Sequence, residues 1–279
     1  MARILSQISS PQNPWIKVVC RLHRRSERYD QNRFLLEGPN LLDEAIAANW
    51  PIEAVCYNPT WAESHPEWLR QVVKLTENTD AVLQPVSEEV LRKMATTDSP
   101  CSIVTIAKIT NDLGSQVEMQ KQELHDTIVA FESIQDPGNL GSMVRIAAAV
   151  GQTSIVISPD SVDPTSPKVL RSSTGQWFRN PPISFNLFEL VEKQRSQGYK
   201  ILAAAANGVC MWDLDLAGPT LLLLGNEGAG LSHRIRSSVT ETVSIPMAKG
   251  IDSLNVSVAG GLILYEKRRQ LKRREMGFS

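Results

Sequence analysis

The chain has 279 residues, a hydrophobic fraction of 42% and a formal net charge of −1 at pH 7. This length exceeds that of most single-core domains, so we expect two domains, and no apolar run is long enough to span a membrane. The opening residues, MARILSQISSPQNP, lack the apolar stretch of a signal peptide, and the four cysteines show no CxxC spacing. We therefore expect a cytoplasmic protein with neither a metal site nor a disulfide framework.

Positive charge is concentrated at the two ends of the chain. Residues 1–33 contain seven Lys/Arg and two Asp/Glu, and residues 266–275 contain six and two. Clustered basic residues are typical of chains that contact nucleic acid, although a run of like charge is more often only a solvated helix face. The overall charge therefore does not exclude an RNA-binding protein.

The first half of the chain predicts a small α/β domain over residues 1–107. Residues 13–23, NPWIKVVCRLH, predict an amphipathic helix with an apolar side and a basic side. Basic residues of this helix and just after it are candidates for RNA binding, namely Lys17, Arg21, Arg24, Arg25 and Arg28. Hydrophobic patterns further along predict strands at residues 33–38, 52–57, 72–75 and 103–107, and helices at residues 39–49, 61–70 and 87–94.

The second half predicts another α/β domain, over residues 127–279, after a polar and charged linker at residues 108–126. The expected strands are residues 127–131, 153–157, 183–185, 200–205, 221–224 and 243–245. Helices are expected between them, including residues 140–150 and 168–172 and the segment after Asn255. This alternation predicts a mostly parallel sheet with helices on both faces, in which ligands bind at the carboxyl ends of the strands.

Three of these strands run into polar loops that contain glycine. The loops are ESIQDPGN at residues 132–139, GNEGAG at residues 225–230 and IPMAKGIDSLN at residues 245–255. Glycine allows close approach of the backbone to a ligand or to another loop. Asn255 precedes a helix and has the residue type of an N-cap, which is an ordinary structural role when considered alone.

Taken together, the three loops resemble the motifs of the SpoU/TrmH branch of the SPOUT RNA 2'-O-ribose methyltransferases. The matching residues are Asn139 with Arg145, then LLGNEGAG at residues 223–230, then IPM and SLNVSVA within residues 245–259. The resemblance implies a trefoil knot in the carboxyl-terminal domain and S-adenosylmethionine as cofactor. The cofactor contacts that it implies are Leu224, Gly225, Gly230, Ile245, Met247 and Leu254.

The resemblance also implies catalytic roles. Arg145 would activate the ribose 2'-hydroxyl, with Asn139, Ser253 and Asn255 as positioning groups. Because arginine is effectively always protonated, Arg145 is better suited to hold a phosphate and stabilise the developing alkoxide, and direct proton removal is the rival role. Glu227 either accepts a hydrogen bond from the substrate or fixes the turn.

The amino-terminal half resembles the substrate-binding extension of many members of this family, a fold akin to certain ribosomal RNA-binding proteins. The resemblance rests on Ser10, Asn13-Pro14, Lys17, FLLEG at residues 34–38 and Glu44-Ala45. It favours ribosomal RNA over transfer RNA as the substrate. A homodimer is also expected, because the helix that begins VSVAGGLILY is apolar on nearly every side and needs burial on more than one face.

Two other functions deserve comparison with this hypothesis. A nucleotide-dependent oxidoreductase would use Gly225, Gly228 and Gly230, but their spacing is GxxGxG rather than GxGxxG. A non-catalytic RNA-binding protein would not need Asn139, Arg145, Ser253 and Asn255 together. Both alternatives are therefore disfavoured.

Overall fold

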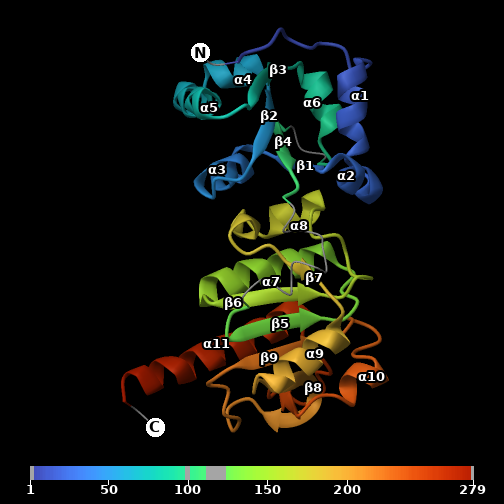
Figure 1. The fold of residues 1–279 in the computed structure, drawn as a ribbon, viewed down its shortest axis with the longest axis vertical. Coiled ribbons are helices and arrows are strands. Elements are labelled where there is room, and N and C mark those ends of the chain that lie inside the picture. Colours follow the sequence, from blue (N-terminus) through green and yellow to red (C-terminus); the bar gives the residue numbers. More distant parts are fainter. Residues whose placement is uncertain (1–2, 98–100, 111–123, 278–279) are drawn as a thin grey trace. The chain divides into compact units, whose positions relative to one another are not determined.

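The computed structural model describes residues 3–97, 101–110 and 124–277 (Figure 1). The chain forms two compact units, one made of Met1–Thr110 with Thr165–Phe178 and the other of Asn111–Pro164 with Arg179–Ser279. Most of the predicted linker at residues 108–126 lies outside the described residues.

The sheet of the first unit has four strands in the order β1-β4-β2-β3. Strand β4 (Ile103–Lys108) is antiparallel to β1 (Arg33–Glu37) and to β2 (Ile52–Tyr57), whereas β3 (Val82–Pro85) is parallel to β2. Because β3 is short and ends in proline, its hydrophobic pattern was too weak for it to be predicted.

The predicted strand at residues 72–75 is wrong, since these residues belong to helix α5 (Pro66–Asn78). Trp68 and Val72 lie four residues apart and are only 8% and 0% exposed. Arg70, midway between them, is exposed, although in a strand it would lie on the same face as Trp68 and Val72. Burial at a spacing of four without burial of the middle residue is the helical pattern. The apolar run was therefore assigned the wrong period.

The helices of the first unit begin at strong local signals. Besides α5, these helices are α1 (Pro14–Arg21), α2 (Arg25–Gln31), α3 (Pro39–Ala47), α4 (Pro59–Glu63) and α6 (Glu88–Met94). Proline occupies the first turn of α1, α3, α4 and α5, where its missing N–H costs no hydrogen bond. Asn13 caps α1, and Ser87 caps α6 through its hydroxyl.

A segment from the middle of the sequence, Thr165–Phe178, packs within the first unit, which differs from the predicted division at residue 127. It contains α8 (Pro167–Ser172) and a short 3-10 helix, η2 (Gln176–Phe178). Trp177 is fully buried, and its ring centroid lies 5.3 Å from that of Phe34 and 5.1 Å from that of Trp50. This aromatic packing joins residues far apart in sequence, so no local pattern could reveal it.

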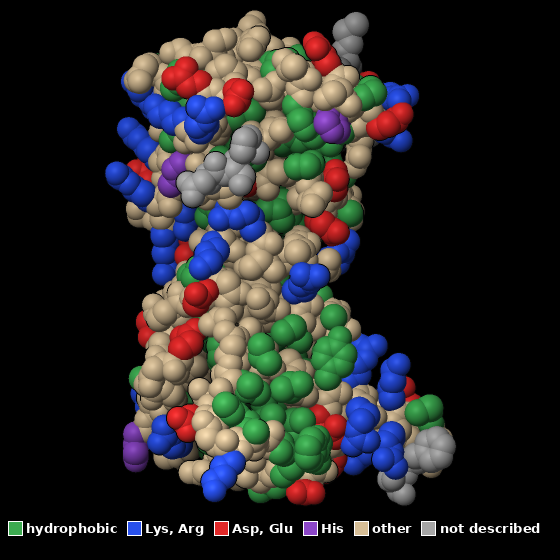
Figure 2. Space-filling view, turned by 180° about the vertical axis from the view of Figure 1, so that it is seen from behind, with side chains coloured by type: hydrophobic (Ala, Val, Ile, Leu, Met, Phe, Trp, Pro, Cys, Tyr) green, Lys and Arg blue, Asp and Glu red, His purple; other side chains and the backbone are tan. Residues whose placement is uncertain are grey.

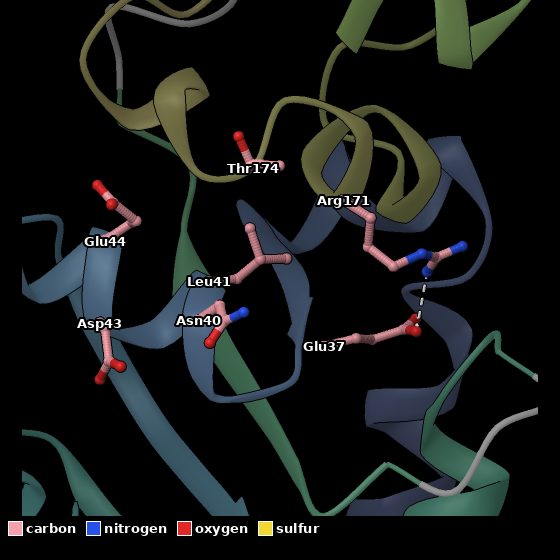
Figure 3. A pocket seen from close by; sticks show the side chains of 7 residues that line it. All are labelled: Glu37, Asn40, Leu41, Asp43, Glu44, Arg171 and Thr174. Atoms are coloured by element: carbon pink, nitrogen blue, oxygen red, sulfur yellow. Dashed lines mark hydrogen bonds and ion pairs between the residues drawn. The ribbon is translucent and has the colours of Figure 1, made fainter. Parts of the chain in front are cut away.

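An ion pair also holds this segment to the sheet of the first unit. Arg171 of α8 donates to the Glu37 carboxylate of β1 at 2.9 Å, beside a hollow of about 410 Å³ (Figure 3). The Glu37 side chain is only 2% exposed and also accepts a 2.6 Å hydrogen bond from the Thr96 hydroxyl. A buried carboxylate needs such partners, so the loss of Arg171 would destabilise the docked segment.

The second unit contains a six-stranded sheet in the order β10-β8-β9-β5-β6-β7, and all its strands are parallel. This order confirms the predicted parallel α/β architecture. The strands are β5 (Thr127–Phe131), β6 (Thr153–Ile157), β7 (Ile183–Ser184), β8 (Lys200–Cys210), β9 (Thr220–Leu224) and β10 (Glu241–Ser244). The trefoil knot stays a prediction.

Helices cover both faces of this sheet. Ile128, Leu221 and Leu223 belong to a buried cluster with residues of α9 (Leu187–Ser196) and α10 (His233–Arg236). Leu224 points to the opposite face, where α11 (Val256–Glu275) packs against β9 and against α7 (Pro137–Val150). The alternation along β9 is the period-two pattern of a strand buried on both sides.

The close packing of α11 depends on two glycines. A Cβ atom at Gly260 would lie 2.3 Å from the Met143 Cε atom, and one at Gly261 would lie 3.1 Å from the Ile146 Cδ1 atom. These glycines therefore bring α11 against α7 of the same chain. Within the described residues, no helix is both long enough and apolar enough to cross a membrane.

Candidate cofactor and catalytic site

A cavity of about 830 Å³ opens at the carboxyl ends of the strands in the second unit. Its walls come from the loop after β9, the loop after β10 and a bulged part of β8. All six residues predicted to contact the cofactor line it, namely Leu224, Gly225, Gly230, Ile245, Met247 and Leu254. The structure therefore brings two separate sequence motifs to one cavity.

The loop after β9 is a tight turn that only glycine permits at two positions. A Cβ atom at Gly225 would lie 2.3 Å from the Gly230 carbonyl carbon, and Gly230 has a φ of +68°. Asn226 closes the turn by exchanging backbone hydrogen bonds with Gly230 at 3.1 and 2.9 Å. Its side chain also accepts from the backbone of Gly228 and Ala229 at 2.9 and 3.0 Å. The turn is therefore held together by its own hydrogen bonds.

The bulge of β8 was not predicted. Thr242 of β10 pairs with Ala203, but the next residue, Val243, pairs with Val209, so residues 204–208 leave the ladder. Ala204, Ala205, Ala206 and Asn207 consequently line the cavity. The Asn207-Gly208 dipeptide is a common turn signal and could have marked this departure from the strand.

A chain of side-chain hydrogen bonds joins three predicted catalytic residues. The Asn255 side-chain oxygen accepts from the backbone N–H groups of Ser257 and Val258, so Asn255 caps α11 as expected. Its Nδ2 atom must then point away, and it donates to Asn139 Oδ1 at 2.7 Å. Asn139 Nδ2 in turn donates to Glu227 Oε1 at 2.9 Å. The cap therefore fixes the orientation of both amides.

Two family models match this chain. One, described as the SpoU rRNA Methylase family, matches residues 126–265, and another, described as the MRM3-like substrate binding domain, matches residues 13–105. The chain belongs to the SpoU rRNA methylase family. This membership confirms the resemblance inferred from the three loops.

Some similar proteins match nearly the whole length of the chain. It is 38% identical over 268 residues to an uncharacterized tRNA/rRNA methyltransferase of Synechocystis sp., a match that covers 95% of this chain and 94% of the relative. It is 31% identical over 257 residues to the 23S rRNA (uridine(2479)-2'-O)-methyltransferase of Streptomyces viridochromogenes, covering 89% and 87%. The solved structure of an AdoMet-bound rRNA methyltransferase from Sinorhizobium meliloti superposes with a TM-score of 0.83 at 28% identity, covering 96% and 98%.

The two remaining catalytic candidates, Ser253 and Arg145, lie in different parts of the second unit. Ser253 lines the cavity and is exposed. Arg145 lies on α7, six residues after Asn139, and its exposed side chain is not among the residues that line the cavity. No described residue forms a hydrogen bond or ion pair with its guanidinium. Arg145 is therefore an exposed cation outside the lining of the cavity.

The cavity is also lined by two charged residues that were not predicted as site residues, Asp252 and Arg236. Asp252 lies just before the predicted Ser253, and Arg236 ends α10. Asp252 lies in the third loop between its two matched segments, so its position in the sequence was a usable signal, whereas Arg236 belongs to none of the three loops. In the described part of the chain, no group of three or more His, Cys, Asp or Glu residues is placed to hold a metal ion.

The predicted RNA-binding residues of the first unit divide into two groups. Lys17, Arg21, Arg24 and Arg25 are exposed on or next to α1 and α2. Arg28 departs from the prediction because it is only 3% exposed. Its guanidinium donates to the carbonyls of Leu22 and His23 at 2.8 and 3.0 Å and to the Thr165 hydroxyl at 3.1 Å. Arg28 therefore stabilises the fold of the first unit.

The basic carboxyl-terminal end is also partly structural. Lys267 is 4% exposed, and its ammonium donates to the Leu216 carbonyl at 2.9 Å and the Thr220 hydroxyl at 3.0 Å. Burial lowers the pKa of Lys267 to about 8. Arg268 donates to the Ala149 carbonyl at 3.0 Å, near the end of α7. These two residues therefore belong to the packing of α11 rather than to a free basic surface.

Proposed function

We propose that this chain methylates a ribose 2'-hydroxyl of ribosomal RNA and that its cavity binds the methyl donor, S-adenosylmethionine. Membership of the SpoU family makes the chain an RNA 2'-O-methyltransferase. Ribosomal RNA is supported as the substrate by relatives named as 23S rRNA methyltransferases and by the MRM3-like substrate binding domain.

The observation that carries the proposal is that the hydrogen bonds among Asn255, Asn139 and Glu227 begin and end at residues of the cavity wall. Glu227 and Asn255 both line the cavity, and both hydrogen bond to Asn139. A cofactor in the cavity would therefore lie next to groups that position a substrate. The wall suits a nucleoside because Leu224, Ile245, Met247 and Leu254 are apolar and because the glycines expose the backbone to a ligand.

When bound, S-adenosylmethionine supplies an electrophilic methyl group. The 2'-hydroxyl must give up its proton to solvent as it attacks, so negative charge develops on the ribose oxygen. Arg145 is a permanent cation and is suited to hold the adjacent phosphate and stabilise this charge. Asn139, Asn255 and Ser253 would orient the ribose, and Glu227 would hold Asn139 in place through its hydrogen bond.

The test is methyl transfer from tritiated S-adenosylmethionine to purified 23S, 16S and transfer RNA, followed by mapping of linkages that resist alkaline hydrolysis. We expect label in ribosomal RNA at a 2'-O-methylated nucleotide. Label confined to transfer RNA would overturn the substrate assignment. Tight RNA binding without transfer to any of the three would favour the non-catalytic alternative.

We also propose that the protein is a homodimer. Val258, Leu262 and Tyr265 lie at helical spacing on α11 and are 47%, 41% and 52% exposed, although the opposite side of this helix is packed against α7 and β9. Figure 2 shows hydrophobic side chains gathered on one face of the second unit. Such an apolar patch marks an interaction surface. Sedimentation at micromolar concentration should give twice the mass of the chain, and a monomeric mass would contradict the proposal.

A further inference from the structure

Arg236 is a charged residue of the cavity to which neither the motifs nor the catalytic network assign a role. Its Nη2 atom donates to the Leu231 carbonyl at 3.2 Å and lies 3.7 Å from the position that a Cβ atom at Gly230 would occupy. No described carboxylate forms an ion pair with it. A guanidinium has five N–H donors in a planar fork, so Arg236 retains donors for a ligand in the cavity.

The charges of the cavity indicate which group Arg236 would bind. Its ionisable lining residues, among those described, are Glu227, Asp252 and Arg236, which give a net charge of −1. S-adenosylmethionine carries a sulfonium, an ammonium and a carboxylate, so its net charge is +1. The two carboxylates match the two cationic groups of the cofactor, and the guanidinium matches its carboxylate.

We propose that Arg236 binds the carboxylate of the methyl donor and thereby orients its methionine part in the cavity. This inference rests on the proposed function, because it requires S-adenosylmethionine to occupy this cavity. Arginine pairs with a carboxylate through two parallel N–H···O hydrogen bonds, which fix orientation as well as adding affinity. An RNA phosphate is the competing partner for a guanidinium. The position of Arg236 on the same cavity wall as Gly230 and Leu231 favours the cofactor.

The experiment combines two ligands with the wild type and three variants. Calorimetry would measure the affinity of the wild type, R236Q and R236K for S-adenosylmethionine and for its decarboxylated analogue, which keeps the sulfonium and the ammonium. We expect R236Q to weaken S-adenosylmethionine binding by on the order of tenfold or more, as is typical for loss of a hydrogen bond between charged groups. Its affinity for the decarboxylated analogue should stay within twofold of the wild-type value.

Two further comparisons sharpen the result. R236K should recover only part of the affinity, because lysine keeps the charge but loses the planar fork. R234Q is the matched control, since Arg234 lies on the same helix but its guanidinium packs over the Phe188 ring at 3.9 Å, away from the cavity lining. It removes one positive charge from α10 and should bind both ligands as the wild type does.

The outcomes separate this inference from the proposed function. Equal weakening of both ligands by R236Q, or no weakening of either, would overturn the carboxylate assignment. So would normal S-adenosylmethionine binding by R236Q together with weaker filter binding of ribosomal RNA, because the partner would then be a phosphate. Failure of the wild type to bind S-adenosylmethionine would instead overturn the proposed function. If R236Q does not fold, the same ligand comparison between R236K and the wild type decides the question.

Discussion

Asn255 donates a 2.7 Å hydrogen bond to Asn139 from a side chain whose oxygen caps α11. The helix cap and the proposed positioning role therefore fall on one amide. The two residues are 116 positions apart and come from different loops, so the cap of one helix orients a polar group at the start of another. This arrangement allows substitutions that separate stability from activity.

Asn255→Ala removes both the cap and the donor. We expect it to lower the free energy of unfolding by about 1 kcal/mol, the usual cost of losing an N-cap, and to reduce methyl transfer strongly. Asn255→Asp keeps an oxygen that can cap the helix but replaces the donor to Asn139 by a carboxylate. Its stability should stay close to that of the wild type while its activity falls. Chemical denaturation and methyl-transfer assays test this pair, and an Asp variant with full activity would contradict the positioning role.

Gly225→Ala should abolish cofactor binding, because the new Cβ atom would lie 2.3 Å from the Gly230 carbonyl carbon and would force the turn apart. Gly228→Ala is the matched control in the same loop. A Cβ atom there would lie 3.6 Å from Asn226 Oδ1, which is an ordinary contact. Calorimetry with S-adenosylmethionine should show loss of binding for the first variant and nearly wild-type affinity for the second. Equal effects would mean that the turn adapts to a side chain.

Arg145→Ala should eliminate methyl transfer while leaving the affinity for S-adenosylmethionine within about twofold, because Arg145 does not line the cavity. Arg145→Lys should recover little activity, since the lysine ammonium lacks the planar fork that binds phosphate. Single-turnover methyl transfer and calorimetry measure the two effects. An alanine variant that kept most of its turnover would show that Arg145 is only a surface residue of α7.

Lys267 should make stability depend on pH. Because burial lowers its folded pKa to about 8 while the unfolded value is near 10.5, the unfolded state binds more protons between these two values. The free energy of unfolding should therefore rise with pH over this window, with a slope of at most about 1.4 kcal/mol per pH unit from this group. Lys267→Met should lack this increment. The difference between the two denaturation series isolates it from other titrating groups, and parallel series would contradict the assignment.

Local signals in the sequence were sufficient to predict the structural roles of several residues of this site. Asn255 has the residue type of a cap, and the glycines at positions 225 and 230 occupy a turn that excludes side chains, so their roles follow from nearby backbone geometry. The resemblance to the family then assigned chemistry to both loops. The cavity confirms only that these residues lie together, and their contacts with the cofactor stay predictions.

Features that depend on distant contacts could not be predicted in this way. Arg28 looks like its exposed neighbours in sequence, but it is buried because Thr165, 137 positions later, packs beside it. Trp177 is likewise buried against residues of β1 and the loop before β2. Arg236 belongs to no motif and reaches the cavity only because α10 follows the glycine turn. Periodicity reports which face of an element is buried, but not which distant segment covers it.

Because Arg28 is buried, it should be left out of the residues that are substituted to test RNA binding by the first unit. We expect the combined substitution of Arg21, Arg24 and Arg25 by glutamine to weaken RNA binding and to flatten its salt dependence, because all three side chains are exposed. Each lost phosphate contact should reduce the log-log slope by roughly 0.7 to 0.9. Affinity for S-adenosylmethionine should not change, since none of the three residues lines the cavity.

Arg28→Gln is the contrasting variant, and it should affect stability instead of the salt slope. Its guanidinium bonds two backbone carbonyls and the Thr165 hydroxyl, so the substitution leaves buried acceptors unsatisfied, at a cost of about 1 to 3 kcal/mol for each such group. Filter binding at several salt concentrations and thermal denaturation distinguish the two variants. An unchanged slope in the triple variant would mean that the exposed basic residues are only a solvated helix face. A reduced slope in Arg28→Gln at full stability would mean that Arg28 leaves its buried position to contact RNA.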